Sequence, residues 1–156
     1  MSRRLNVNQI FDPVLTVNIS ATNVRHLVYL LVANRPIRYG RKYSRIIYVG
    51  TTERGVRRIA SSASKRIQQA VDTKVLRGLR RLEAYVVWAK TRSGLHPTKK
   101  SQNLWRVLER AILIKFCNMH GGQRPRLNET GHKMKDKGEF NIFREKRIGR
   151  IIDRYK

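Results

Sequence analysis

The chain has 156 residues, enough for one domain with a hydrophobic core and too few for two domains of ordinary size. Its 35 Lys and Arg residues against 10 Asp and Glu residues give a net charge of +25, while the 40% of hydrophobic residues argue against a disordered chain. No stretch approaches the ~20 apolar residues of a membrane span, the single cysteine excludes an intrachain disulfide, and the four histidines lack the spacing of zinc ligands.

The positive charge is spread along the chain. Residues 54–81 contain nine basic residues and one acid, Asp72, and apolar residues alternate with them. A disordered nucleic-acid-binding arm usually concentrates its charge in one block, so this distribution favours a folded basic surface. Because such a surface needs a polyanionic counterpart, we expect a protein that binds nucleic acid and has no membrane partner. The single cysteine, Cys117, fits a reducing cytoplasm.

Two strands are predicted first. Residues 1–23 show no clear periodicity and are taken as an amino-terminal extension. The hydrophobic run at residues 24–33 is typical of a buried strand, and residues 45–49 form a second strand that ends at a glycine. The basic segment 34–43 between them contains Pro and Gly and is predicted to be a loop, so the two strands should form a hairpin.

Two helices and a third strand should follow. Apolar residues at helical spacing predict a helix that is capped at residues 51–53 and reaches about residue 71. Residues 82–89 alternate as a strand, and residues 91–101 are expected to be a loop. A long helix is predicted over residues 101–120, because the glycine pair that follows is a common helix end.

A last helix is predicted over residues 140–155, where isoleucines recur at helical spacing among arginines. The complete pattern predicts an α/β (α+β) fold with a small three-stranded, mostly antiparallel sheet flanked by helices and a carboxy-terminal basic helix. We expect a core over residues 24–130 and a basic helical extension over residues 131–156.

Glu109 is the first candidate for chemistry. Acids are rare in this chain, and this one lies beside the apolar stripe of the long predicted helix. A partly buried carboxylate is costly unless it is paired or bound to a metal. One interpretation is an ion pair with Arg106, Arg110 or a neighbouring helix. The other is a magnesium ligand, since one carboxylate together with phosphate oxygens and waters is a usual way to hold that ion.

Two tyrosines, Tyr29 and Tyr48, lie within the two hairpin strands. Tyrosine is a good strand former, so packing in the core is one interpretation. The alternative is that the two hydroxyls point at one spot. A phenol has a pKa near 10, so it would need a nearby cation to act as a general base.

Arg58 and Asn128 complete the set of candidates. Arg58 points away from the apolar stripe of its helix, so it is either a solvent-exposed side chain or a ligand of the scissile phosphate. Arg57 and Arg66 are competitors for that role. Asn128 is either a turn former or a side chain that orients a phosphate.

In this order, on a strand–strand–helix–strand–helix frame, the candidates resemble the active site of the GIY-YIG nucleases. The motifs that carry the resemblance are Val28-Tyr29, Tyr48-Val49-Gly50, Arg58, Leu108-Glu109-Arg110-Ala111-Ile112 and Pro125-Arg126-Leu127-Asn128. Three positions depart from the family pattern. Leu27 replaces the signature glycine, Thr51 stands where several members have a lysine, and Ser62 stands where a basic residue is often found.

The resemblance implies a compact, restriction-endonuclease-like enzyme that hydrolyses DNA phosphodiester bonds with Mg²⁺ or Mn²⁺. Glu109 would hold the metal ion, and Tyr29 or Tyr48 would deprotonate the attacking water. Arg58 would stabilise the transition state, and Asn128 would position the phosphate. RNA is the alternative substrate, and cutting both strands would require a homodimer or two successive nicks.

Basic side chains outside this set are predicted to bind the nucleic-acid backbone. They are Arg38, Arg41, Lys42, Arg57, Arg66, Arg92, Lys99 and Lys100. The alternative function is that of a non-catalytic nucleic-acid binder, either a ribosomal or nucleoid type of protein or a degenerate nuclease fold.

Overall fold

The computed structural model describes residues 19–21, 24–89, 103–128 and 134–156. The fold is α+β, with one antiparallel three-stranded sheet in the order β2-β1-β3. The strands are β1 (Leu27–Tyr39), β2 (Lys42–Thr52) and β3 (Leu82–Val87). The helices are α1 (Val56–Asp72), α2 (Leu104–Met119), α3 (Glu139–Ile142) and α4 (Glu145–Asp153), with 3-10 turns η1 (Ile19–Ala21) and η2 (Lys74–Leu76).

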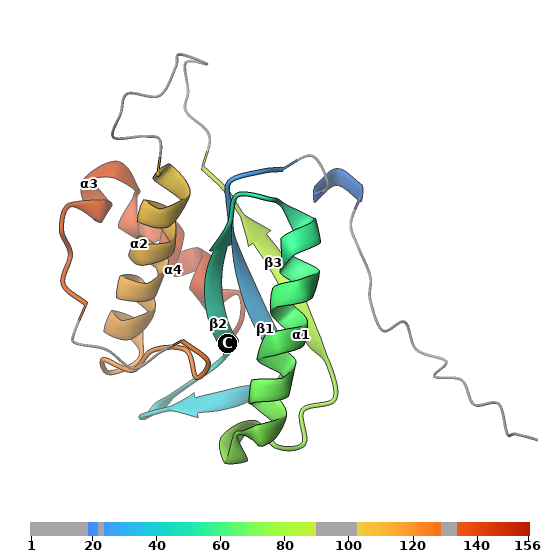
Figure 1. The fold of residues 1–156 in the computed structure, drawn as a ribbon. Helices are drawn as coiled ribbons and strands as arrows, with labels where there is room; N and C mark the ends of the chain where they lie inside the picture. Colours follow the sequence, from blue (N-terminus) through green and yellow to red (C-terminus); the bar gives the residue numbers. More distant parts are fainter. Residues whose placement is uncertain (1–18, 22–23, 90–102, 129–133) are drawn as a thin grey trace, which may run out of the picture.

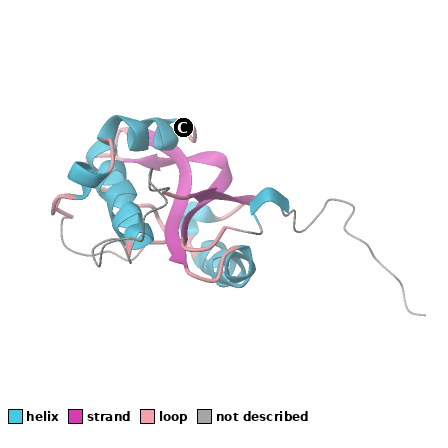
Figure 2. Ribbon diagram, turned by 90° about the horizontal axis from the view of Figure 1, so that it is seen from above, coloured by secondary structure: helices cyan, strands magenta, loops and turns pink. Residues whose placement is uncertain are grey.

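The helices lie on two sides of the sheet. Helix α1 covers one face, and α2, α3 and α4 lie on the other (Figures 1 and 2). The central strand β1 is buried from Leu27 to Ala33 because it is covered on both faces and paired on both edges there. The predicted helix-flanked, three-stranded sheet is therefore confirmed, and all of its strand pairs are antiparallel.

The predicted loop at residues 34–43 is wrong. Strand β1 continues to Tyr39, β2 begins at Lys42, and Gly40 and Arg41 form the turn between them. The register shifts between Val32 and Ile37, where four residues of β1 lie opposite Arg45. This bulge explains how Pro36, which has no N–H to donate, is accommodated inside a strand.

Helix α1 begins later than the predicted cap at residues 51–53. Thr51 and Thr52 instead complete β2, where they pair with Val28 and Leu27. The residue before the helix is Gly55, with φ +67, and a Cβ built there would lie 2.8 Å from the carbonyl oxygen of Val24. The start of α1 therefore packs directly on the segment that leads into β1.

The helix predicted over residues 140–155 is two short helices, α3 and α4, with an extended residue at Phe143 between them. Helix α4 carries both signs of charge, with Glu145 and Asp153 among its basic residues. Its apolar side chains Ile148 and Ile152 are buried in the common core, and the carbonyl oxygen of Tyr155 accepts a 2.6 Å hydrogen bond from the Arg45 N–H of β2. Residues 134–156 thus pack into the main body of the fold.

The carboxy-terminal end of α2 agrees with the prediction. The helix stops at Met119, and the turn that follows contains Gly121 with φ +64, as the glycine pair predicts. The cap predicted at residue 101 lies outside the described residues, as do the predicted loop 91–101 and most of the amino-terminal extension. Within the described residues, no helix is long and apolar enough to cross a bilayer.

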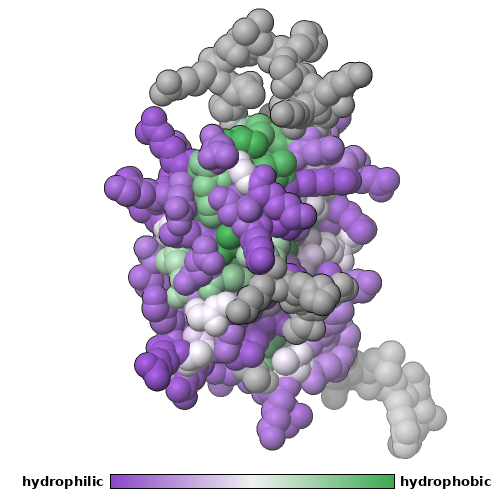
Figure 3. Space-filling model, turned by 90° about the vertical axis from the view of Figure 1, so that its left-hand side faces the viewer, coloured by the Kyte–Doolittle hydropathy of each residue, from purple (hydrophilic) through white to green (hydrophobic). Residues whose placement is uncertain are grey.

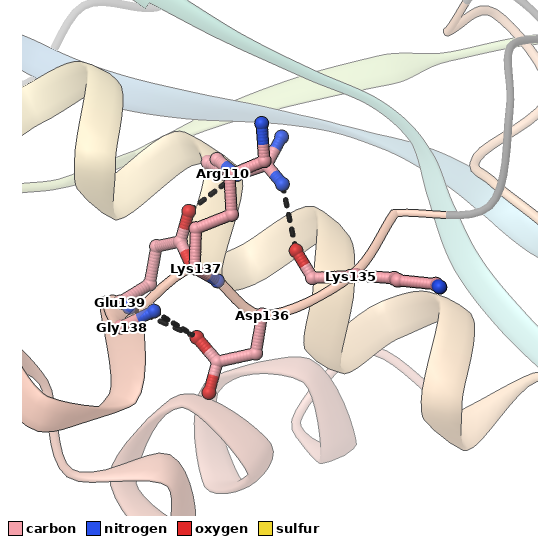
Figure 4. A network of polar contacts seen from close by, with 6 residues as sticks. All are labelled: Arg110, Lys135, Asp136, Lys137, Gly138 and Glu139. Carbon is pink, nitrogen blue, oxygen red and sulfur yellow. Dashed lines mark hydrogen bonds and ion pairs between the residues drawn. The ribbon is translucent and has the colours of Figure 1, made fainter.

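The side of the molecule that carries α2 and α3 is largely hydrophilic, with a smaller hydrophobic area in its upper half (Figure 3). Beneath this surface, Arg110 of α2 forms an ion pair with the buried carboxylate of Glu139 and donates a 2.7 Å hydrogen bond to the Lys135 carbonyl (Figure 4). Asp136 accepts hydrogen bonds from the Gly138 and Glu139 N–H groups at 2.8 and 2.9 Å. This network fixes the segment before α3 on α2.

We expect Arg110→Met to lower the free energy of unfolding by about 2–4 kcal/mol, because it leaves the Glu139 carboxylate buried without its cation. The matched control is Arg106→Met, one turn earlier on α2. Arg106 pairs with Glu53 at 3.5 Å and both side chains are more than half exposed, so its loss should cost less than about 1 kcal/mol. Urea unfolding measures the free energy of unfolding of both variants. Equal losses in the two variants would contradict the conclusion that Arg110 holds the segment before α3 on α2.

Candidate functional site

Tyr29 and Tyr48 lie together on the sheet face that α1 covers. Tyr29 is directly opposite Gly50, and Leu31 is opposite Tyr48, so the two rings come from neighbouring positions of adjacent strands. Their centroids are 5.8 Å apart with the planes tilted by 46°. The Tyr29 hydroxyl forms a 2.6 Å hydrogen bond with the Ser62 hydroxyl of α1. The structure therefore brings the two predicted phenols together.

Gly50 makes this approach possible. A Cβ built on Gly50 would lie 2.6 Å from Cε1 of Tyr48 and 2.8 Å from both Cζ and the hydroxyl oxygen of Tyr29. These distances are well inside van der Waals contact, and ring atoms cannot bend away from them as a flexible chain end can. The glycine after Tyr48-Val49 is required here for space, since both rings lie against its backbone.

Arg66 is the arginine that contacts the tyrosines. Its Nη2 donates a 3.2 Å hydrogen bond to the Tyr48 hydroxyl, and its Cζ lies 4.4 Å from the Tyr48 ring centroid. Its Nη1 is held by the Gln69 side chain at 2.7 Å. The Arg66 guanidinium is therefore a cation in direct contact with the Tyr48 ring and hydroxyl.

Arg58, the favoured candidate from sequence, is exposed and donates a 3.2 Å hydrogen bond to the Ser61 hydroxyl. It lies one helical turn before Ser62, as Arg66 lies one turn after it. Arg57 is exposed beside it. Arg58 and Arg66 therefore lie on either side of Ser62 along one face of α1. The guanidinium of Arg58 is in solvent, and that of Arg66 lies against Tyr48.

Burial raises the pKa of Tyr29 to about 12, an effect that the Ser62 hydrogen bond only partly offsets. Tyr29 is therefore a neutral phenol at physiological pH. A neutral phenol donates a hydrogen bond well and accepts a proton poorly. Tyr29 is also almost fully buried and its hydroxyl is bonded to Ser62, so it is the weaker of the two candidates for the predicted general base.

Glu109 is a half-buried carboxylate on α2, and burial raises its pKa to about 7 against the lowering effect of Arg106. Its basic neighbours have other partners, because Arg106 pairs with Glu53 and Arg110 pairs with Glu139. Among the described residues, no hydrogen bond or ion pair engages the Glu109 side chain. The predicted alternative of a simple ion pair therefore has no support in this part of the chain.

The first turns of α2 lie at the same end of the molecule as the start of α1, the start of β1 and the end of β2 (Figure 1). Two contacts fix this arrangement. The Trp105 ring lies 4.4 Å from the ring of His26, which precedes β1, and Arg106 reaches Glu53, which follows β2. Glu109 is one turn further along α2. Glu109 therefore lies near the end of the sheet where β1 begins and β2 ends. Because α2 and α1 cover opposite faces of the sheet, Glu109 and the two tyrosines lie on opposite sides of it, and no hydrogen bond joins Glu109 to either tyrosine.

Asn128 lies at the free edge of β2. Its Oδ1 accepts a 2.9 Å hydrogen bond from the Val49 N–H, and its Nδ2 donates a 2.8 Å bond to the Val49 carbonyl. The Leu127 N–H adds a 2.8 Å bond to the carbonyl of Ile47. The carboxamide therefore behaves like a short partner strand that covers an open sheet edge. It holds the backbone between Tyr48 and Gly50, and this positioning role differs from the predicted contact with phosphate.

The residues predicted to bind the nucleic-acid backbone are divided between the two ends of the sheet. Arg57 is at the end where α1 begins, and Arg66 is half-buried against Tyr48. The hairpin-turn residues Arg38, Arg41 and Lys42 are exposed at the opposite end of the strands (Figure 1). The turn is about ten residues from Tyr29, or roughly 30 Å of strand. Arg92, Lys99 and Lys100 lie outside the described residues.

The residue that sequence analysis missed is Ser62, which holds the Tyr29 hydroxyl. It had been noted only as a departure from the family pattern. Its spacing of four residues from both Arg58 and Arg66 is the signal that places it between them on one helix face. In the described residues, no cluster of three or more His, Cys, Asp or Glu side chains could hold a metal ion.

Comparisons with known protein families, with curated proteins and with solved structures found no match to this chain. The resemblance to the GIY-YIG nucleases therefore stays a prediction from its motifs. Function is therefore inferred from the tyrosine cluster, formed by Tyr29, Tyr48, Ser62 and Arg66, and from Glu109.

Gly50→Ala should lower the free energy of unfolding by about 1–3 kcal/mol, because the added methyl group forces both tyrosine rings to move. The matched control is Gly149→Ala in α4, where the nearest atom to a new Cβ is the flexible end of Lys115 at 3.3 Å. That change should be neutral or stabilising, since alanine favours a helix. Urea unfolding that ranked the two variants equally would show that the rings tolerate a side chain between them.

Glu109→Gln should stabilise the protein at pH 8 and have little effect at pH 5. The pKa of Glu109 in the folded protein is raised above its value in the unfolded chain. The wild-type free energy of unfolding is therefore highest below the unfolded pKa, where Glu109 is protonated in both states, and it falls as pH rises through about 7. Allowing for partial solvent exposure, the gain at pH 8 is about 1–2 kcal/mol. Each kcal/mol corresponds to a rise in Tm of about 2–4 °C. The control is Asp72→Asn at an exposed position, and a Tm difference for Glu109→Gln that does not change with pH would refute the assigned desolvation.

Proposed function

We propose that this chain is a metal-dependent endonuclease that hydrolyses DNA phosphodiester bonds, resembling the compact GIY-YIG enzymes of restriction or defence type. The observation that carries the proposal is the state of Glu109. In a chain with a net charge of +25, this half-buried carboxylate has no ion-pair partner among the described residues, although arginines stand on either side of it. A protein that only binds nucleic acid gains nothing from such a group.

Glu109 fits a divalent cation of the Mg²⁺ or Mn²⁺ type. Its oxygen donors suit hard cations, its carboxylate is not committed to a neighbouring arginine, and such sites are completed by substrate phosphates and waters. When bound there, the cation would supply Lewis-acid stabilisation of charge on the phosphate and lower the pKa of a bound water. Positive charge close to Glu109 would also favour its ionised form at neutral pH.

The remaining residues would act on the phosphate and on the attacking water. The exposed guanidinium of Arg58 can bind phosphate oxygens through two parallel hydrogen bonds. Tyr48, half-buried beside Arg66, would contact the attacking water, and the buried Tyr29, bonded to Ser62, would hold the Tyr48 ring in place. Asn128 would hold the Tyr48–Gly50 backbone in place for this reaction.

A second candidate is a non-catalytic nucleic-acid binder, which two observations favour. The raised pKa of Tyr29 makes that phenol a poor base, and the Asn128 carboxamide is occupied by the backbone of Val49. A nuclease fold that has kept its basic surface and lost its chemistry would have both features. Cleavage assays separate the two candidates.

Purified protein should nick supercoiled plasmid in the presence of Mg²⁺ or Mn²⁺ and should be inactive in EDTA. Glu109→Gln should reduce the rate at least about 100-fold, because loss of a metal-binding carboxylate exceeds the usual effect of losing an outer-shell partner. Its affinity for DNA should remain within about threefold of the wild type. Glu145→Gln, which changes an exposed acid on α4, is the matched control and should alter neither quantity.

Two results would contradict the nuclease proposal. The first is a wild-type protein that binds the plasmid and cuts neither DNA nor RNA with either metal ion, which would support the non-catalytic binder. The second is undiminished cutting by Glu109→Gln, which would point to a contaminating nuclease or to a different site.

A further inference from the structure

Trp88 is a large aromatic side chain left on the surface beside the candidate site. It comes directly after β3, and its side chain is 46% exposed. Val86 is directly opposite Tyr29 in the sheet, so both side chains point to the face covered by α1. Trp88 comes two residues after Val86, just past Val87, the last paired residue of β3.

The position of Trp88 is close to the tyrosine cluster. Two strand residues correspond to about 7 Å. The last pair of β1 and β3 is Val28 with Val87, so Trp88 follows at the end of the sheet where β1 begins. A base next to a nucleotide held near the tyrosines would therefore reach the indole.

Cations surround this end of the sheet. Arg25 precedes β1 and is exposed, and Arg57 and Arg58 are exposed in the first turn of α1. The start of α1 packs on the segment before β1, as the 2.8 Å approach of a Gly55 Cβ to Val24 shows. An exposed indole at the same end of the sheet as these arginines offers a flat apolar face together with positive charge. The complement is a nucleobase on its phosphate backbone, since every base has a face that stacks on aromatic rings.

We propose that Trp88 stacks on an unpaired base of the substrate strand, one or two nucleotides from the bond that is cut. The faces of bases inside an intact duplex are already stacked on their neighbours, so this contact selects single strands, flaps and other sites where a base has left the stack. The substrate class is thus DNA with an unpaired segment next to the cleavage point. The stacking contact itself requires only that the protein bind nucleic acid. Its position relative to the cut bond rests on the proposed nuclease function.

Tryptophan fluorescence tests the contact directly, because Trp88 and Trp105 are the two tryptophans of the chain. The Trp105→Phe variant reports on Trp88 alone, and Trp88→Phe reports on Trp105 as its matched control. Each is titrated in EDTA with a single-stranded oligonucleotide and with a blunt hairpin duplex. We expect the single strand to quench the Trp88 emission strongly and the duplex to quench it weakly, with small changes at Trp105 in both titrations.

Affinity gives the second measurement. Trp88→Ala should weaken binding of the single strand by about 5- to 150-fold, the usual range for loss of one stacked base, and should change duplex binding less than about twofold. Trp88→Phe keeps an aromatic face and should retain most of the affinity. A Trp88 emission that is unchanged by saturating single strand, or equal losses for both DNA forms, would overturn the inference.

Since these titrations contain no divalent ion, they separate this inference from the proposed function. Plasmid cutting without quenching of Trp88 would refute only the stacking contact. Quenching of Trp88 without any cutting would support the contact and refute the nuclease.

Discussion

The close approach of two phenol rings over Gly50 is the constraint on which the candidate site depends. Tyr29 and Tyr48 come within 5.8 Å only because the residue between them has no side chain. Their hydroxyls then meet α1, where Ser62 binds one and Arg66 binds the other. Helix α1 is in this way fixed on the sheet by polar contacts of the candidate site as well as by its apolar stripe. A side chain at position 50 would disturb the site and the docking of α1 together.

Charge pairing sets Glu109 apart. Most of the acidic side chains in the described residues form an ion pair or accept a hydrogen bond. Five form ion pairs with arginine or lysine, and Asp136 accepts backbone hydrogen bonds. Asp72 is exposed to solvent, so it carries little desolvation cost. Among the described acids, Glu109 alone combines partial burial with a pKa raised to about 7, and such shifted pKa values are common at binding sites.

Sequence periodicity predicted the three strands, their antiparallel order and the long helices. Each of these segments buries one face, so its apolar residues recur with the period of a strand or of a helix. It failed at residues 34–43, where Pro36 indicated a loop and a bulge allowed a strand instead. The tyrosine pair was predictable, since both residues lie in strong strand signals. The role of Arg66 and the backbone contacts of Asn128 were not, because they depend on how α1 and the loop at residues 125–128 pack on β2. Local pattern carries no such tertiary information.

The proposed function requires Glu109 and the tyrosine cluster, which lie on opposite faces of the sheet, to serve one metal-dependent site at the end where β1 begins. Paramagnetic line broadening tests it most directly, by adding Mn²⁺ to isotope-labelled protein bound to a short oligonucleotide that resists cleavage. We predict that broadening begins at the amides around Glu109 and Gly50 and is lost in the Glu109→Gln variant. Broadening centred on Asp136 and Glu139, or broadening that Glu109→Gln leaves unchanged, would contradict this account.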